Sequence, residues 1–194
     1  MRHSRKLRLG ASLALGITAA VTFAAAASAG QIFSEHFRDA KDSEIISNFC
    51  GAAGLTVEFA TTADGHVHAV THGRDGLAYF GAQIRQTEVV TNLANGNSVR
   101  SASTFVDKDL RVTDNGDGTL TLLILATGNA VLYGDDGKVI ARNTGQQRVE
   151  ILVDHGGTPS DPRDDEFLEF LGVVKDSTGR NDDFCEFAVP MLTA

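Results

Sequence analysis

Short turn signals recur between residues 63 and 145, and they constrain the fold more than any other feature of the chain. Each signal places glycine beside asparagine, aspartate or threonine, residue types that favour tight hairpins. The signals fall at residues 63–65, 95–97, 115–118, 127–129, 135–137 and 143–145. Strands joined by such short turns run antiparallel, because parallel crossovers need a dozen or more connecting residues.

Between the turn signals, apolar residues recur with a period of two. Leu120, Leu122 and Ile124 occupy alternate positions, and the same pattern recurs over 55–59 and 148–153. Such alternation is typical of strands with one face on a core and one in water. We therefore expect an all-β fold, an antiparallel up-and-down meander of roughly eight to eleven short strands. Closing into a barrel would hide the edges of the sheet, and a β-sandwich is the alternative.

One short helix is also expected as an option near residues 164–175. Phe167, Phe170, Leu171 and Val174 follow helical spacing, but the same stretch also fits a final hairpin strand. The sequence leaves these two interpretations open.

The first 29 residues have the composition of an export signal. A basic head precedes an apolar run over residues 9–26, and Ala27-Ser28-Ala29 forms a small-residue cleavage motif. We interpret residues 1–29 as a signal peptide and residues 30–194 as a single secreted, extracellular domain. The apolar run is rich in alanine and interrupted by glycine, serine and threonine, which favours cleavage over a membrane anchor.

The chain is acidic, with a formal net charge of -8. Loss of the leader would make it more acidic, because the leader carries only basic charges. A negative surface repels phosphate backbones and anionic lipid heads. Nucleic acid, and membrane after cleavage, are therefore not expected partners.

The two cysteines, Cys50 and Cys185, are expected to form a disulfide. In an oxidising compartment, two thiols without a third competitor most simply pair with each other. The bridge would tie the N-terminal segment to the last strand. The alternative is a catalytic or metal-binding cysteine, but neither residue belongs to a Cys-x-x-Cys motif or has a histidine beside it.

The best candidates for a reactive site are His66 and His68, with Glu58 as a third member. If residues 63–65 form a three-residue turn, all three share one face of a hairpin. Same-face residues two apart lie roughly 6 to 7 Å from each other, so the histidines could share one divalent metal ion. His72 lies too far along the strand to join them. A solvated polar face with two ordinary histidines is the alternative.

Two acidic segments carry weaker signals. Residues 114–119 contain the oxygen ligands of a calcium loop, but their spacing differs from that of an EF-hand and favours a hairpin turn. Asp161, Asp164, Asp165 and Glu166 lie in the longest connection, where paired carboxylates could act as acid and base on a sugar or ester. Ordinary solvated charge is the alternative for this second segment.

The overall pattern resembles small secreted bacterial proteins with a leader, a glycine-punctuated β domain and one disulfide. Residues 49–51, 115–119 and 183–185 carry this resemblance. It implies a secreted β domain, and no functional residue is transferred from it. The barrel interpretation is also similar to calycin-type ligand binders, but the Gly-x-Trp motif of lipocalins is absent because the chain has no tryptophan.

Two functions follow as expectations. The first is a secreted, non-catalytic binding or interaction module without a cofactor, whose partner is a small molecule or an extracellular protein. The second is an extracellular hydrolase or isomerase that uses His66, His68 and Glu58, with one divalent metal ion, or the acids of 161–166. They differ in whether those side chains point into a common cavity.

Overall fold

The computed structural model describes residues 30–73 and 75–194. The expected signal peptide, residues 1–29, lies outside this part of the chain. The described residues form one antiparallel sheet whose strand order follows the chain. Its strands are β1 (Gln31–Ser47), β2 (Thr56–His72), β3 (Leu77–Asn92), β4 (Ser98–Asp114), β5 (Thr119–Tyr133), β6 (Val139–Asp154) and β7 (Glu166–Lys175). Two 3₁₀ turns, η1 (Phe49–Gly51) and η2 (Pro162–Asp164), and one helix, α1 (Phe184–Thr193), complete the fold.

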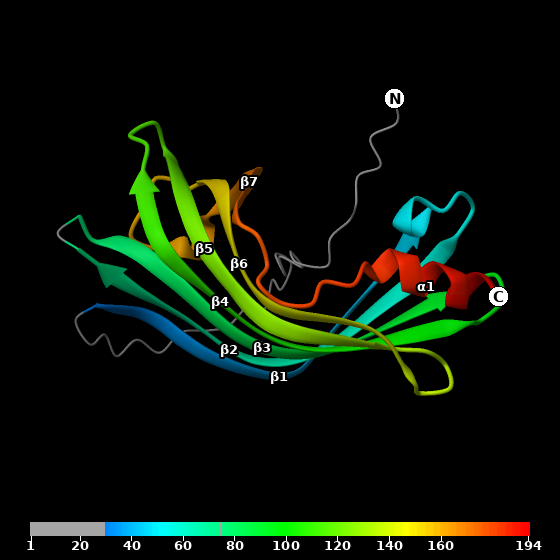
Figure 1. The fold of residues 1–194 in the computed structure, drawn as a ribbon. Helices are drawn as coiled ribbons and strands as arrows, with labels where there is room; N and C mark the ends of the chain where they lie inside the picture. The colour runs from blue at the N-terminus through cyan, green and yellow to red at the C-terminus, as the bar shows by residue number, and fades with distance from the viewer. Residues whose placement is uncertain (1–29, 74) are drawn as a thin grey trace, which may run out of the picture.

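The sheet is strongly curved, and α1 lies on its concave side at one end (Figure 1). The antiparallel meander expected from the turns is therefore confirmed. The sheet is open, with β1 and β7 as its two edges, so closure into a barrel is not confirmed. Because all the strands belong to one sheet, the alternative two-sheet sandwich is wrong. No helix of the described residues is long and apolar enough to cross a membrane.

The sheet has seven long strands, not the eight to eleven short strands expected. The turns at 95–97, 115–118 and 135–137 are confirmed, whereas 63–65, 127–129 and 143–145 lie in the middle of β2, β5 and β6. Between β2 and β3 the described residues Gly73, Asp75 and Gly76 form turns instead. Each of the three wrong turn predictions therefore rested on a glycine that lies inside a strand.

Close packing explains two of these glycines. A Cβ at Gly65 would lie 2.5 Å from Cζ of Phe37, the residue directly opposite on β1. A Cβ at Gly128 would lie 2.9 Å from Cβ of Phe105, its opposite residue on β4. At Gly65 the aromatic ring of Phe37 covers the space that the glycine leaves, a known way of accommodating glycine in a sheet. At Gly128 the backbone of β4 itself lies too close for a larger residue.

The helix expected near 164–175 is wrong, since this stretch forms β7. Its pairing with β6 is irregular: Phe167, Phe170 and Val173 lie opposite Val153, Ile151 and Val149. β7 therefore advances three residues for every two of β6. Apolar residues spaced by three mimic a helix in the sequence, although a bulged strand produces the spacing.

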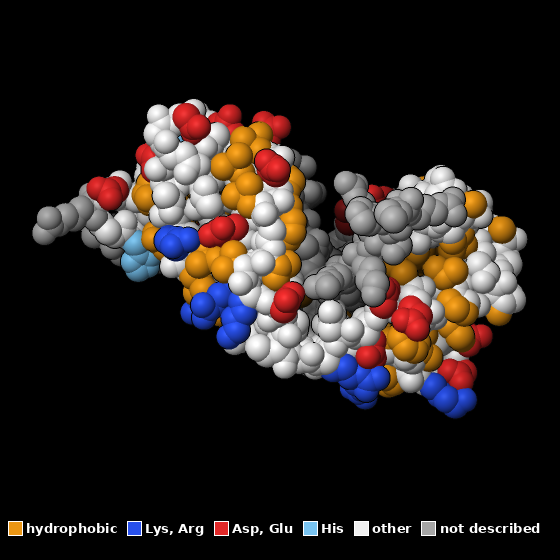
Figure 2. Space-filling view, turned by 45° about the horizontal axis from the view of Figure 1, so that its top comes forward, with side chains coloured by type: hydrophobic (Ala, Val, Ile, Leu, Met, Phe, Trp, Pro, Cys, Tyr) orange, Lys and Arg blue, Asp and Glu red, His pale blue; other side chains and the backbone are white. Residues whose placement is uncertain are grey.

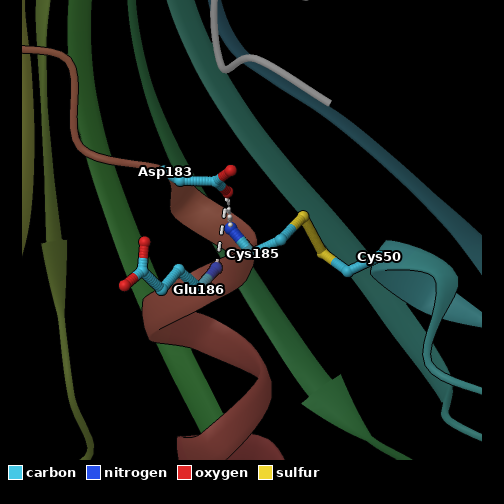
Figure 3. Close-up of a disulfide and its surroundings, with 4 residues drawn as sticks. All are labelled: Cys50, Asp183, Cys185 and Glu186. Atoms are coloured by element: carbon cyan, nitrogen blue, oxygen red, sulfur yellow. Dashed lines mark hydrogen bonds between the residues drawn. A yellow bond between two sulfur atoms is a disulfide. The ribbon is translucent and has the colours of Figure 1, made fainter. Parts of the chain in front are cut away.

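The helix lies later, at Phe184–Thr193. Asp183 begins it by accepting hydrogen bonds from the backbone N–H groups of Cys185 and Glu186 (Figure 3). At the other end, the side-chain amides of Asn92 and Asn95 both donate to the carbonyl of Leu192, at 2.9 and 3.0 Å. The turn between β3 and β4 thus caps the C-terminus of α1.

The expected disulfide between Cys50 and Cys185 is confirmed. It joins η1 to the first turn of α1 (Figure 3), so the expected attachment to the last strand is wrong. The Cα atoms are 5.6 Å apart and the residues are separated by 135 positions. The bridge therefore fixes the helix to the start of the sheet.

The apolar core consists of three clusters, not one continuous layer. The largest lies under α1 and contains Val57, Val90, Val99, Leu132, Phe184 and Leu192. A second joins Val112, Leu120, Leu122, Ile151 and Val153 near the far ends of β4 to β6. A third lies between them and contains Ala63, Ala82 and Ile84, with Phe37 and Phe105 packed against it.

Candidate functional site

The cross-strand register assigns strand residues to one of the two faces of the sheet. Val57, Val90 and Val99 belong to the cluster that includes α1, so their face is the concave one. Directly opposite residues of an antiparallel pair share a face, and so do residues two apart on a regular strand. The concave face can therefore be followed from β1 to β7 through the paired positions.

The two faces differ in charge. Concave positions hold the acidic residues Glu35, Asp42, Glu44, Glu88, Asp107, Asp109 and Asp114. Convex positions hold the basic residues Lys41, Arg85, Arg100, Lys108, Arg111, Arg142, Arg148 and Lys175. Arg38 lies in a bulge of β1 and has no opposite residue. Among the paired residues of the described strands, no base therefore stands on the concave face.

The convex face is mixed in sign, because it also carries acids. These are Glu58, Asp64, Glu150, Asp154, Glu166 and Glu169. Arg111 forms an ion pair of 3.0 Å with Glu150, and the Arg100 guanidinium lies 4.4 Å from the ring centroid of Tyr133. In Figure 2, most of the visible basic side chains lie along the lower border, away from the saddle between the two lobes. Arg111 and Arg100 thus have partners on the convex face, opposite to the face of the concave acids.

Asp109 is the most perturbed of the concave acids. Its Oδ2 atom accepts a hydrogen bond of 2.7 Å from the backbone N–H of Phe80. Burial raises the pKa of Asp109 to about 7, and the negative charges of Asp165 and Asp107 act in the same direction. Burial also raises the pKa of Asp107 to about 6. These carboxyl groups are therefore partly protonated near neutral pH.

Asp165 comes from the connection between β6 and β7, which lies against β3 through a hydrogen bond from the N–H of Ala78 to the carbonyl of Pro159. The pKa of Asp165 is raised to about 6. Burial is the largest cause, and the negative charge of Asp164 raises the pKa further. Its Oδ1 atom is buried and has no hydrogen-bond partner among the described residues. A buried carboxylate oxygen without a donor is costly, so this group favours a bound proton or a bound donor.

Glu88 is the acid most excluded from solvent, with 8% of its surface exposed. It accepts a hydrogen bond of 2.7 Å from the side chain of Gln86. Burial raises its pKa, and a hydrogen bond with Ser101 on the neighbouring strand offsets part of that rise. Glu88 is therefore held by polar neighbours on the floor of the concave face.

The expected metal site is not assembled. Because β2 runs without a turn, Glu58 and His66 lie on one strand, eight residues and about 26 Å apart. The assumed hairpin at 63–65 is wrong, so Glu58 is not a neighbour of the histidines. No group of three or more histidine, cysteine, aspartate or glutamate residues suited to a metal ion occurs among the described residues.

His66 and His68 belong instead to a row of imidazole rings on the convex face. His36 stacks on His66 with ring centroids 4.3 Å apart, and His66 stacks on His68 at 5.3 Å. Desolvation lowers the pKa of His66, and the positive charges of His36 and His68 lower it further. The ring of His68 lies over Gly81, where a Cβ would approach within 2.6 Å. The histidines thus face away from the concave acids, and His68 has a packing role.

The acidic segment at 161–166 is largely dispersed. Asp161 forms an ion pair with Arg163, and Asp164 accepts a hydrogen bond from the hydroxyl of Thr158. Only Asp165 joins the concave acids. Residues 114–119 form the turn between β4 and β5, in which Asp117 accepts hydrogen bonds from Thr119.

Sequence reasoning missed Asp107, Asp109 and Glu88. The alternation Asp107-Lys108-Asp109 did carry a signal, because a period of two places both acids on one face and the base on the other. The pairing register of the strands was needed to show that Asp107 and Asp109 stand on the concave face. Comparisons with protein-family models, with curated proteins and with solved structures found no match to this chain.

Proposed function

We propose that this protein is a secreted, non-catalytic binding module whose concave face holds a cationic ligand. The observation that carries the proposal is the charge of the concave face, which holds acids but no base among the paired residues of the described strands. A ligand bearing amines or guanidinium groups would place cations beside Asp107, Asp109 and Asp165, adding to the positive charge that His155 contributes near Asp165. This specifies the binding function expected from the sequence.

The electrostatics favour such a ligand over an anionic or an apolar one. Burial disfavours the charged form of Asp107, Asp109 and Asp165, as their raised pKa values indicate. A bound cation reverses this effect, because an opposite charge within a few ångströms stabilises a carboxylate. The free Oδ1 atom of Asp165 also gains a donor when an ammonium group binds beside it.

The test is calorimetric titration of the purified protein with tetralysine and with spermine as cationic probes. We expect saturable binding that weakens with salt and strengthens as the pH rises from about 5 to above 7, where Asp107 and Asp109 lose their protons. The double variant Asp107→Asn, Asp109→Asn should bind at least about tenfold more weakly.

The matched control is Glu58→Gln, which removes an acid from the convex face. It should leave the affinity unchanged within about twofold. Equal losses in the two variants would indicate attraction to overall negative charge and would contradict a concave site. Tetraglutamate should not bind to any of the variants.

One observation favours a second candidate, an extracellular hydrolase. The negative charge of Asp165 helps to raise the pKa of Asp109, and a pKa of about 7 suits a general acid. A glycosidic substrate is the class that such a pair would act upon. In this hydrolase hypothesis the catalytic groups are concave acids, not His66, His68 and Glu58 as expected from the sequence. It predicts that Asp165→Asn abolishes turnover of a chromogenic glycoside while leaving the fold intact.

A further inference from the structure

β7 carries a three-residue repeat that divides it into three rows. The row Glu166, Glu169, Gly172 and Lys175 pairs with convex positions of β6, and the row Phe167, Phe170 and Val173 pairs with concave positions. The third row, Leu168, Leu171 and Val174, is left out of the pairing at each register shift. This third row therefore lies along the free edge of the sheet.

The free edge of β7 is strongly apolar. Leu168, Leu171 and Val174 are 46%, 45% and 56% exposed, and the neighbouring Phe167, Phe170 and Val173 are 39%, 45% and 41% exposed. In Figure 2 hydrophobic side chains gather along the border of one lobe, where β7 lies in Figure 1. Among the described residues no strand pairs with this edge. Water-exposed strands normally carry polar residues or proline there.

We propose that β7 is a homodimerisation surface, in which two copies of this chain meet edge to edge through their antiparallel β7 strands. The two-fold axis stands perpendicular to the sheet and passes between Phe170 and Leu171. In this register Glu166 of one copy lies opposite Lys175 of the second copy, and Glu169 lies opposite Gly172. The apolar pairs are Phe167 with Val174, Leu168 with Val173, and Phe170 with Leu171.

Charge complementarity supports this register, because the ends of β7 carry opposite charges on the same convex face. Each two-fold contact brings together two Glu166–Lys175 pairs. Each concave apolar residue meets an edge residue of the second copy, so no charged group is placed against an apolar one. The rows of β7 are thus complementary to themselves in reverse order, which an isologous interface requires.

The area also suits a dimer. The exposed parts of the six apolar side chains form a patch on the order of 500 Å² per copy, the size of the largest apolar patch on many proteins, which is often a functional surface. Two such patches together remove on the order of 1,000 Å² from water, the lower limit for a specific interface. The bulges of β7 interrupt the regular row of backbone groups, so side chains are the main contacts.

The experiment is sedimentation velocity of the purified full-length secreted protein across a dilution series, with circular dichroism to verify folding. We expect a concentration-dependent dimer. Leu171→Asp should raise the dimer dissociation constant at least about tenfold. Val106→Asp places the same change at a 41% exposed valine on β4, so it should leave the dimer unaffected.

Charge reversal tests the register. Glu166→Lys alone and Lys175→Glu alone should each weaken the dimer, because like charges then face each other. The double variant should restore the wild-type dissociation constant, since the ion pairs are re-formed with exchanged partners. Failure of this rescue would overturn the antiparallel register.

Two further outcomes would overturn the dimer itself. One is a wild-type protein that is monomeric throughout the series. The other is a monomer that co-sediments with phosphatidylcholine vesicles through Leu171, which would make the apolar edge a lipid-binding surface. Tetralysine binding is tested by substitution of Asp107 and Asp109 and dimerisation by substitution of β7 residues, so each proposal can fail without the other.

Discussion

At the scale of single residues, the concave carboxyl groups have the clearest consequences. Asp109 contacts the backbone of Phe80 and lies within reach of the charge of Asp165. Its folded-state pKa of about 7 exceeds the value near 3.9 expected in an unfolded chain. The fold therefore binds a proton that the unfolded chain releases over this range.

The sign of the pH dependence follows from this difference. Stabilisation by Asp109 is complete below about pH 4 and is lost as the pH rises through about 7. We expect the free energy of unfolding to fall by roughly 2 to 4 kcal/mol over that window. Asp109→Asn should make the profile flatter, which urea unfolding at pH 4, 5.5 and 7 measures. An unchanged slope in this variant, or a flatter slope in Glu58→Gln, would contradict the assignment.

At the scale of single elements, glycines inside long strands decide the shape of the sheet. Gly128 stands mid-way along β5, where a Cβ would lie 2.6 Å from the carbonyl oxygen of Thr104 and 2.9 Å from Cβ of Phe105. Because both neighbours belong to the backbone of β4 or are attached directly to it, they cannot move aside cheaply. The close approach of β4 and β5 therefore depends on this glycine.

Gly128→Ala should lower the free energy of unfolding by about 1 to 3 kcal/mol. Gly134→Ala is the matched control, because its Cβ would meet the flexible end of Met191 at 3.1 Å. We expect the control to change stability by less than about 0.5 kcal/mol. Thermal and urea unfolding provide the comparison, and equal effects would show that β4 and β5 tolerate a methyl group between them.

The elements also show why pattern reading failed where it did. Gly65, Gly128 and Gly145 stand beside aspartate or asparagine-containing segments that favour turns locally, yet each is paired across a strand. Pairing with the neighbouring long strands overrode the local preference of these segments for turns. A short segment of sequence carries no information on that pairing. The helix predicted in the region of β7 was wrong for another reason. A bulge at every third residue gives the apolar residues a spacing close to that of a helix.

At the scale of the whole molecule, one covalent link joins segments that are remote in sequence. The Cys50–Cys185 bridge fixes α1 over Val57, Val90 and Val99 at one end of an open sheet. The bridge acts together with the packing of Phe184 and Leu192 in the core and with the cap from Asn92 and Asn95. Closing a loop of 135 residues removes much of the entropy of the unfolded chain.

Cys50→Ser together with Cys185→Ser should lower the free energy of unfolding by up to about 5 kcal/mol. Reductant should have the same effect on the wild type and no effect on the double variant. Urea unfolding with and without reductant measures both. Hydrogen exchange should also show faster opening of α1 than of β5 once the bridge is removed. A double variant as stable as the wild type would show that packing alone retains the helix.

The sequence by itself determined the antiparallel meander and the pairing of the two cysteines. Its turn signals and two-residue alternation act between neighbours in the chain, and the two thiols had no competitors. The tertiary structure decided strand length, the open form of the sheet and the grouping of Asp107, Asp109 and Asp165. These features depend on register and on contacts between distant segments, and register cannot be read locally when glycines occur inside strands. The same register separated Glu58 from His66 and brought the acids to the concave face.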